Sequence, residues 1–165
     1  MIKRTILCLL GLALLCLASA SRAGTEAQPE AAALAIRSTY DPALAGKVGA
    51  DEHGMRHYVM VVLKTGPNTV PKGPQRDEMF KGHFANIQRL AAEGKLAVAG
   101  PFDGVDGWRG MFIFAVEDIE EAKKLVATDP VVINGEMTPE FHKYYGTAAL
   151  MLINDLHNKV TRQPF

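Results

Sequence analysis

The sequence predicts a protein of the α+β class whose strands and helices follow in the order β-α-β-β-α-β. Short stretches rich in apolar and aromatic residues, bounded by glycine, proline or polar residues, predict four strands. They occupy residues 57–64, 96–99, 110–116 and 141–145. Two segments between them repeat apolar residues at the spacing of a helix that buries one face, residues 75–93 and about 118–128. The two middle strands should pair as a hairpin.

Capping residues mark the expected ends of the two long helices. Pro74 suits the first turn of the first helix, and Gly94 follows its end. Asp118 is the expected N-cap of the second helix. That helix should end at Asp129-Pro130, because the residue before a proline is disfavoured in the helical conformation.

The composition is typical of a single globular domain. The chain has 165 residues, 48% of them hydrophobic and 22% charged, and its formal net charge is zero. No cluster of lysine and arginine alternates with aromatic residues, so we expect no nucleic-acid partner. The histidines show no metal-binding spacing, so we expect neither a metal site nor a cofactor.

The first twenty residues have the pattern of a signal peptide. Lys3 and Arg4 precede a short apolar run, and an A-x-A motif ends at Ala20. We expect cleavage near Ala20, export to the periplasm or the medium, and no stable membrane span afterwards. A lipoprotein anchor at Cys16 and an uncleaved anchor are the alternatives. Cleavage would remove Cys8 and Cys16, the two cysteines of the chain, and with them any thiol chemistry.

The rest of the chain divides by pattern into a leader, a central domain and two flanking segments. We expect a flexible leader at 21–37, a short helical extension at 38–55, the central domain at 56–146 and a C-terminal helix and tail at 147–165. Asp41 and Pro42 should begin the helix of the extension, as N-cap and first helical residue.

The first strand has apolar residues on both faces, with Val59 and Val61 on one side and Met60 and Val62 on the other. The β-α-β-β-α-β order is that of the ferredoxin-like fold, in which helices cover only one face of the sheet. The other face then needs a cover, and the simplest one is a second copy of the same sheet. We therefore expect a two-fold symmetric homodimer.

His83 and Asp129 are the candidate catalytic residues. His83 lies on the helix face that carries Phe80, Phe84 and Ile87, and a buried imidazole needs a hydrogen-bond partner. Asp129 follows a helix C-terminus, where the helix dipole disfavours a carboxylate. A contact between them would provide a general acid–base. The alternatives are a core histidine bonded to a backbone carbonyl, and an Asx turn at Asp129.

A substrate pocket is expected beside this pair. The candidate lining residues are Phe84, Ile87, Gly100, Pro101, Trp108, Arg109 and Tyr144. Arg109 would steer an acidic substrate, or else be a solvated charge at a strand edge. For the aromatic residues, a place in the core or in the dimer interface is the alternative.

Several short motifs together resemble a known family. They are His83, Leu90, Gly94, Leu96, Ala99-Gly100-Pro101, Gly110, Glu120-Glu121-Ala122 and Asp129-Pro130, spread over about residues 56–146. In this combination the sequence resembles the YCII-related proteins of the dimeric α+β barrel superfamily. The resemblance implies a ferredoxin-like protomer that pairs sheet to sheet, with His83 and Asp129 as its active site.

Three functions remain open at this point. The first is a cofactor-free lyase or isomerase that uses His83 and Asp129 for proton transfer on a small organic acid or lactone. The second is a non-catalytic exported homodimer that binds a small molecule or has a structural role. The third is haem binding, which related barrel folds support.

Overall fold

The computed structural model of the protein describes residues 39–163, and a compact unit begins at Asp41. The expected signal peptide at 1–20 and leader at 21–37 lie outside the described residues. In chain order the elements are α2 (Pro42–Val48), β1 (Met55–Thr65), α3 (Pro74–Ala92), β2 (Leu96–Pro101), η1 (Val105–Gly107), β3 (Trp108–Phe114), α4 (Ile119–Val126), α5 (Pro130–Ile133), β4 (Met137–Thr147), η2 (Ala148–Leu152) and α6 (Ile153–Val160).

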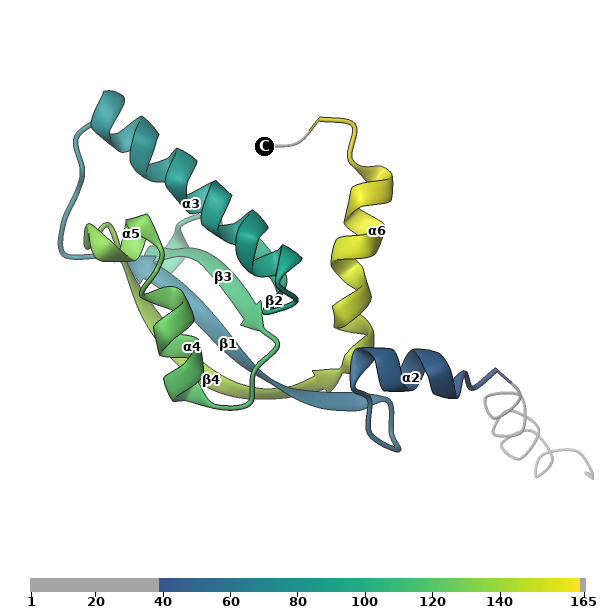
Figure 1. The fold of residues 1–165 in the computed structure, drawn as a ribbon. Helices are drawn as coiled ribbons and strands as arrows, with labels where there is room; N and C mark the ends of the chain where they lie inside the picture. The colour runs from purple at the N-terminus through teal and green to yellow at the C-terminus, as the bar shows by residue number, and fades with distance from the viewer. Residues whose placement is uncertain (1–38, 164–165) are drawn as a thin grey trace, which may run out of the picture. The chain divides into compact units, whose positions relative to one another are not determined.

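The four strands form one antiparallel sheet in the order β2-β3-β1-β4 (Figure 1). With α3 between β1 and β2, and α4 between β3 and β4, this is the ferredoxin-like α+β fold that the sequence predicted. The hairpin of β2 and β3 is confirmed as well. β1, β2 and β4 are longer than their apolar stretches, whereas β3 begins and ends two residues before the stretch predicted for it. β1 and β4 pair over their whole length, from Met55 opposite Thr147 to Thr65 opposite Met137.

The expected N-caps are present at the starts of α2 and α4. Asp41 accepts hydrogen bonds from the amides of Ala43 and Leu44 at the start of α2. Asp118 accepts one from the Glu120 amide at the start of α4. Each carboxylate satisfies a backbone N–H group that has no partner inside the first turn.

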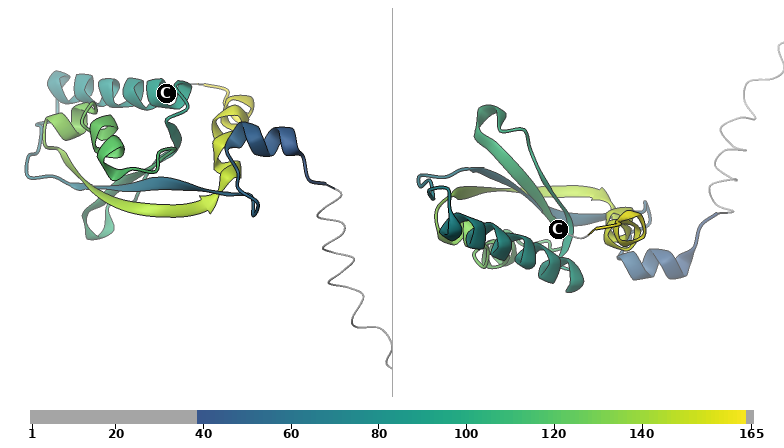
Figure 2. Two further views of the ribbon diagram at one scale, coloured as in Figure 1. Left: turned by 60° about the horizontal axis from the view of Figure 1, so that its bottom comes forward. Right: turned by 90° about the horizontal axis from the view of Figure 1, so that it is seen from above.

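Helices α3, α4 and α5 all lie on one side of the sheet (Figure 2). The main core fills the space between these two layers. It contains the side chains of β1 and β3 that point to the helices, with apolar residues of α3, α4 and α5 above them; Val59, Val61, Leu63, Phe112, Phe114, Leu90, Val126 and Val131 belong to it. Because all of these side chains are almost fully buried, this layer supplies most of the apolar burial that stabilises the fold.

The opposite face of the sheet has a smaller apolar cluster, made by Tyr58, Ala97 and Ile113. Leu150 and Met151, which follow β4, pack against it, and the Tyr58 hydroxyl donates a hydrogen bond to the Thr147 carbonyl at 2.9 Å. The C-terminal segment of the same chain therefore covers one end of this face. The expected homodimer remains a prediction.

The buried face of α3 agrees with the expected one only in part. The apolar pattern predicted a face with Phe80, Phe84, Ile87, Leu90 and Ala91, and with His83 on it. His83 and Leu90 are buried, together with Met79 and Asn86, whereas Phe80 and Ile87 are only partly buried against the core. Phe84 is 42% exposed. The helix is rotated so that a row containing two polar residues faces α5 and the sheet, which is only possible because those polar residues have partners there.

None of the helices among residues 39–163 is long and apolar enough to span a membrane.

Candidate active site

Helix α3 carries His83 in its middle turn. The helix starts at Pro74, after Gly73 with a φ of 137°, and Gly94, just past its end, has a φ of 69°. Glycine is favoured at both positions because side chains rarely adopt positive φ. His83 is only 9% exposed. At this burial the imidazole needs hydrogen-bond partners from the protein.

Asp129 lies between two helices. Helix α4 ends at Val126, and the short helix α5 begins at Pro130 with Asp129 as its N-cap. The Oδ1 atom of Asp129 accepts a hydrogen bond from the Val131 amide at 3.1 Å. The end of α4 alone would disfavour a carboxylate, but the first turn of α5 offers it an unpaired N–H group. Asp129 thus makes a local turn with its own backbone.

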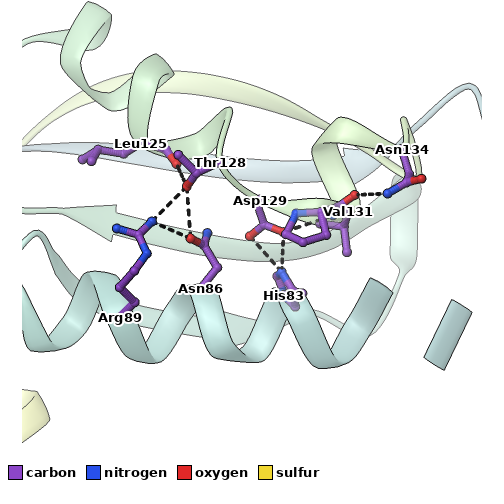
Figure 3. Close-up of polar contacts among 9 residues, drawn as sticks. His83, Asn86, Arg89, Leu125, Thr128, Asp129, Val131 and Asn134 are labelled. Atoms are coloured by element: carbon purple, nitrogen blue, oxygen red, sulfur yellow. Dashed lines mark hydrogen bonds and ion pairs between the residues drawn. The ribbon is translucent and has the colours of Figure 1, made fainter. Parts of the chain in front are cut away.

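Asp129 also binds His83 (Figure 3). The Nδ1 atom of His83 lies 2.9 Å from both Oδ1 and Oδ2 of Asp129, and Asp129 is fully buried. Asp129 therefore both forms a local turn and binds the histidine. A carboxylate at Nδ1 holds a neutral imidazole in the tautomer that is protonated there, which leaves the lone pair on Nε2.

The Nε2 atom of His83 has no hydrogen-bond partner in the part of the chain that the structure describes. Three phenylalanine rings surround the imidazole, with Phe84 at 5.4 Å and Phe80 and Phe112 at 6.1 Å between ring centroids. A free lone pair in these apolar surroundings is available to accept a proton from a bound molecule.

A close approach of α3 and α5 keeps the pair together. A Cβ at Gly82 would lie 3.0 Å from Cγ of Pro130, so a side chain here would press on α5. Gly82 and Pro130 are the chain neighbours of His83 and Asp129. The contact therefore limits the distance between the backbones that carry these two side chains.

A polar network one turn along α3 supports the same junction (Figure 3). Asn86 Oδ1 accepts hydrogen bonds from Arg89 Nη2 at 2.7 Å and from Thr128 Oγ1 at 3.0 Å. Thr128 directly precedes Asp129, so the network ties the α4–α5 connection to α3. The buried Nδ2 atom of Asn86 has no partner among the described residues.

A cavity of about 450 Å³ opens beside His83, between α3 and the strands β2 and β3. Five of the expected pocket residues line it together with His83, and these are Phe84, Ile87, Gly100, Pro101 and Arg109. The lining is mostly apolar, with Arg109 and His83 as its charged or titratable members. A mainly apolar cavity with a few polar groups is the usual form of a small-molecule site.

Trp108 and Tyr144 do not line this cavity. Trp108 is 41% exposed and packs against Phe102 at 5.5 Å between ring centroids. Tyr144 is paired with Tyr58 in the sheet, and their rings lie 6.0 Å apart. Tyr58 belongs to the small cluster on the opposite face, and Tyr144 lies on that face too, because directly opposite residues of an antiparallel pair share a face. The sequence alone did not show on which face of the sheet the rings of Trp108 and Tyr144 lie.

The sequence pattern did not single out Glu136, although it is 2% exposed and lies close to the cavity-lining Arg109. Its Oε2 accepts a hydrogen bond from the Val70 amide at 2.8 Å, and its Oε1 lies 2.7 Å from Arg76 Nη1 and 3.8 Å from Arg109 Nη1. Burial raises the pKa of Glu136, but these hydrogen bonds and positive charges outweigh it, so the pKa is lowered. A glutamate after a glycine turn is ordinarily exposed, which is why it gave no signal.

The comparisons with known proteins concern the same part of the chain. The model of the YCII-related domain matches residues 57–139. The chain belongs to the YCII-related family. The uncharacterized protein YjpA of Bacillus subtilis (strain 168) is 34% identical over 81 residues, which cover 49% of this chain and 85% of YjpA.

The matched range of this YCII-related protein contains His83, Asp129, Arg109 and Glu136, and it ends before Tyr144. Within residues 39–163, no group of three or more His, Cys, Asp or Glu side chains is arranged to hold a metal ion. The chemistry that the described side chains themselves offer is proton transfer at His83 Nε2, supported by Asp129, next to a cationic side chain.

Proposed function

We propose that this YCII-related protein is a cofactor-free enzyme of the lyase or isomerase type that moves protons on a small organic acid or lactone. The observation that carries the proposal is the orientation of His83. Its Nδ1 atom is bound to the buried Asp129 carboxylate, whereas Nε2 has no partner among the described residues and the side chain lines a cavity.

In the proposed reaction, Nε2 of His83 accepts a proton from a carbon atom that is acidified by a neighbouring carbonyl group. The electron pair of the broken C–H bond moves toward that carbonyl. In an isomerase the same proton returns to another carbon; in a lyase the electron pair instead expels a leaving group, to which the imidazolium gives its proton. Asp129 stabilises the imidazolium throughout, and the surrounding phenylalanine rings exclude water from it.

The test is a panel of small carboxylic acids and lactones incubated with the protein in D₂O and followed by ¹H NMR. Wild type should exchange or convert at least one member, and His83→Gln should be slower by about 10²- to 10⁴-fold. His53→Gln is the matched control, since His53 is exposed and pairs with Glu52 in the turn before β1. A His83→Gln protein as active as wild type would refute the proposal, and a panel member that binds unchanged would favour a binding protein.

We also propose that the sheet face opposite the helices is the interface of a homodimer. Met60 and Met111 on this face are only partly buried, although they adjoin the cluster of Tyr58 and Ile113. Light scattering of the purified protein should give twice the mass of the chain, and Met60→Lys should give a monomer. A monomeric wild type would contradict this proposal.

The proposed place of action is outside the cytosol, because residues 1–20 have the pattern of a signal peptide. N-terminal sequencing of the protein from a cell-envelope or medium fraction should begin near Ser21. Recovery of the full-length chain from the cytosol would contradict export.

A further inference from the structure

Arg109 is a partly buried cation with a single, long ion pair among the described residues. Its side chain is 28% exposed and lines the cavity that holds His83. Its nearest ionic partner among the described residues is Glu136, at 3.8 Å from Nη1 to Oε1. The guanidinium has five N–H donors, and no hydrogen bond from them to residues 39–163 is present.

Glu136 is already engaged elsewhere. Its Oε1 makes a 2.7 Å ion pair with Arg76, and its Oε2 accepts the Val70 amide. Arg76 itself donates to the Val70 carbonyl at 2.8 Å and lies over the Phe80 ring at 4.9 Å. Arg76 and Glu136 thus form a close ion pair with each other. Arg109 interacts with Glu136 only through their charges, at 3.8 Å and without a hydrogen bond.

Counting charges in this cluster gives two guanidinium groups for one carboxylate, and therefore one positive charge in excess. The exposed carboxylates of the adjoining loop do not balance it. Asp103 accepts a hydrogen bond from the Val105 amide, and neither Asp103 nor Asp106 makes an ion pair with Arg109. Arg109 has one ion pair at 3.8 Å and no hydrogen bond from its guanidinium to residues 39–163, so its N–H donors remain available to an anionic ligand in the cavity.

We infer that Arg109 binds the carboxylate of the substrate, and that the substrate is therefore an acid and not a lactone. A guanidinium fork matches a planar carboxylate with two parallel hydrogen bonds. The phenylalanine rings beside His83 would then receive an apolar, preferably cyclic, body between the carboxylate and Nε2. The assignment of a reaction at Nε2 rests on the proposed function, whereas the binding of a carboxylate at Arg109 does not.

The experiment measures binding of matched acid and amide pairs, with benzoate and benzamide, and phenylacetate and phenylacetamide, as the probes. Each pair has the same shape and differs in charge. Isothermal titration calorimetry should show at least one acid binding to wild type at least tenfold more tightly than its amide. Arg109→Gln should lose about tenfold to a hundredfold in acid affinity and keep its amide affinity.

Arg162→Gln is the matched control, because Arg162 is an exposed arginine near the C-terminus and its loss changes the net charge equally. It should bind the acids like wild type. Arg109→Lys should recover part of the affinity, because lysine restores the charge without the fork. Circular dichroism melting should show both Arg109 variants folded, since Glu136 keeps its pair with Arg76.

The inference is overturned if acids and amides bind equally, if Arg109→Gln keeps its acid affinity, or if no acid of the panel binds at millimolar concentration. These results differ from a failure of the proposed function. Carboxylate binding that depends on Arg109, together with activity unaffected by His83→Gln, would refute the reaction and leave the binding site standing. Turnover that depends on His83 but not on Arg109 would refute the carboxylate site and leave the proposed reaction standing.

Discussion

Replacing Asp129 by alanine should destabilise the protein through two separate losses. The first is the cap on the Val131 amide, which contributes about 1 kcal/mol at a typical helix N-terminus. The second is the partner of the His83 Nδ1–H group. A buried donor left without an acceptor costs about 1–3 kcal/mol. Asp129→Ala should therefore lower the free energy of unfolding by about 2–4 kcal/mol.

A double-mutant cycle with His83→Phe separates the two losses. Phenylalanine fills a similar volume and needs no hydrogen bond, so in that background Asp129→Ala should cost only the cap. Urea unfolding of wild type, both single variants and the double variant gives the coupling free energy, which should be at least about 1 kcal/mol. If Asp129→Ala is equally destabilising in both backgrounds, within about 0.5 kcal/mol, the two side chains do not interact as described.

Three further predictions test other contacts of the fold. Alanine usually stabilises a helix by roughly 1 kcal/mol relative to glycine. Gly82→Ala should raise the free energy of unfolding by clearly less, because the new Cβ would lie 3.0 Å from Pro130 of α5. Gly46→Ala, with nothing within 4 Å of the new Cβ, should give the full increase in urea unfolding. The pKa of Glu136 is lowered from 4.5 in the folded state, so its contribution to stability is present above pH 4.5 and is lost as pH falls through the folded pKa. Unfolding curves across acid pH should therefore show less acid-induced loss in Glu136→Gln than in wild type, and equal slopes would contradict this. The hydrogen bond to Asp51 raises the pKa of Tyr145 above 10.0, so Asp51→Asn should shift one phenolate absorbance transition to lower pH.

The sheet and the two long helices could be predicted from the sequence because their signals are local. A helix with a proline start and a glycine stop, and an apolar strand bounded by turns, are each determined within a few residues. The Asp41 cap at α2 is another example, since Pro42 follows it directly. Local signals gave the element order, and the order with the usual pairing rules gave the topology.

The His83–Asp129 contact could be predicted for a different reason. A buried imidazole and a carboxylate at a helix C-terminus each destabilise the fold unless they have a partner. In the structure the two side chains are hydrogen-bonded to each other. The same reasoning could not find Glu136. Its burial depends on the amide of Val70 and on the side chain of Arg76 in α3. Contacts between segments so far apart in the chain cannot be predicted from the spacing of neighbouring residues.

Helix α5 was missed, and the buried face of α3 was predicted only in part, because both are set by tertiary packing. A four-residue helix such as Pro130–Ile133 is too short to show periodicity. The rotation of α3 follows from the approach of Gly82 to Pro130 and from the partners of His83 and Asn86. Apolar counting placed Phe84 on the buried face with His83 and Leu90, whereas the polar contacts of His83 and Asn86 leave Phe84 exposed.

The most direct test of the account is the tautomer of His83, read from the ¹⁵N shifts of its two ring nitrogens in long-range ¹H–¹⁵N spectra. At a pH where the ring is neutral, Nδ1 should be protonated and Nε2 unprotonated in the free protein. Asp129→Ala should remove that preference, because the carboxylate at Nδ1 is its cause. A neutral His83 protonated at Nε2 in the wild-type protein would contradict the account, since the atom proposed to accept the substrate's proton would already carry one.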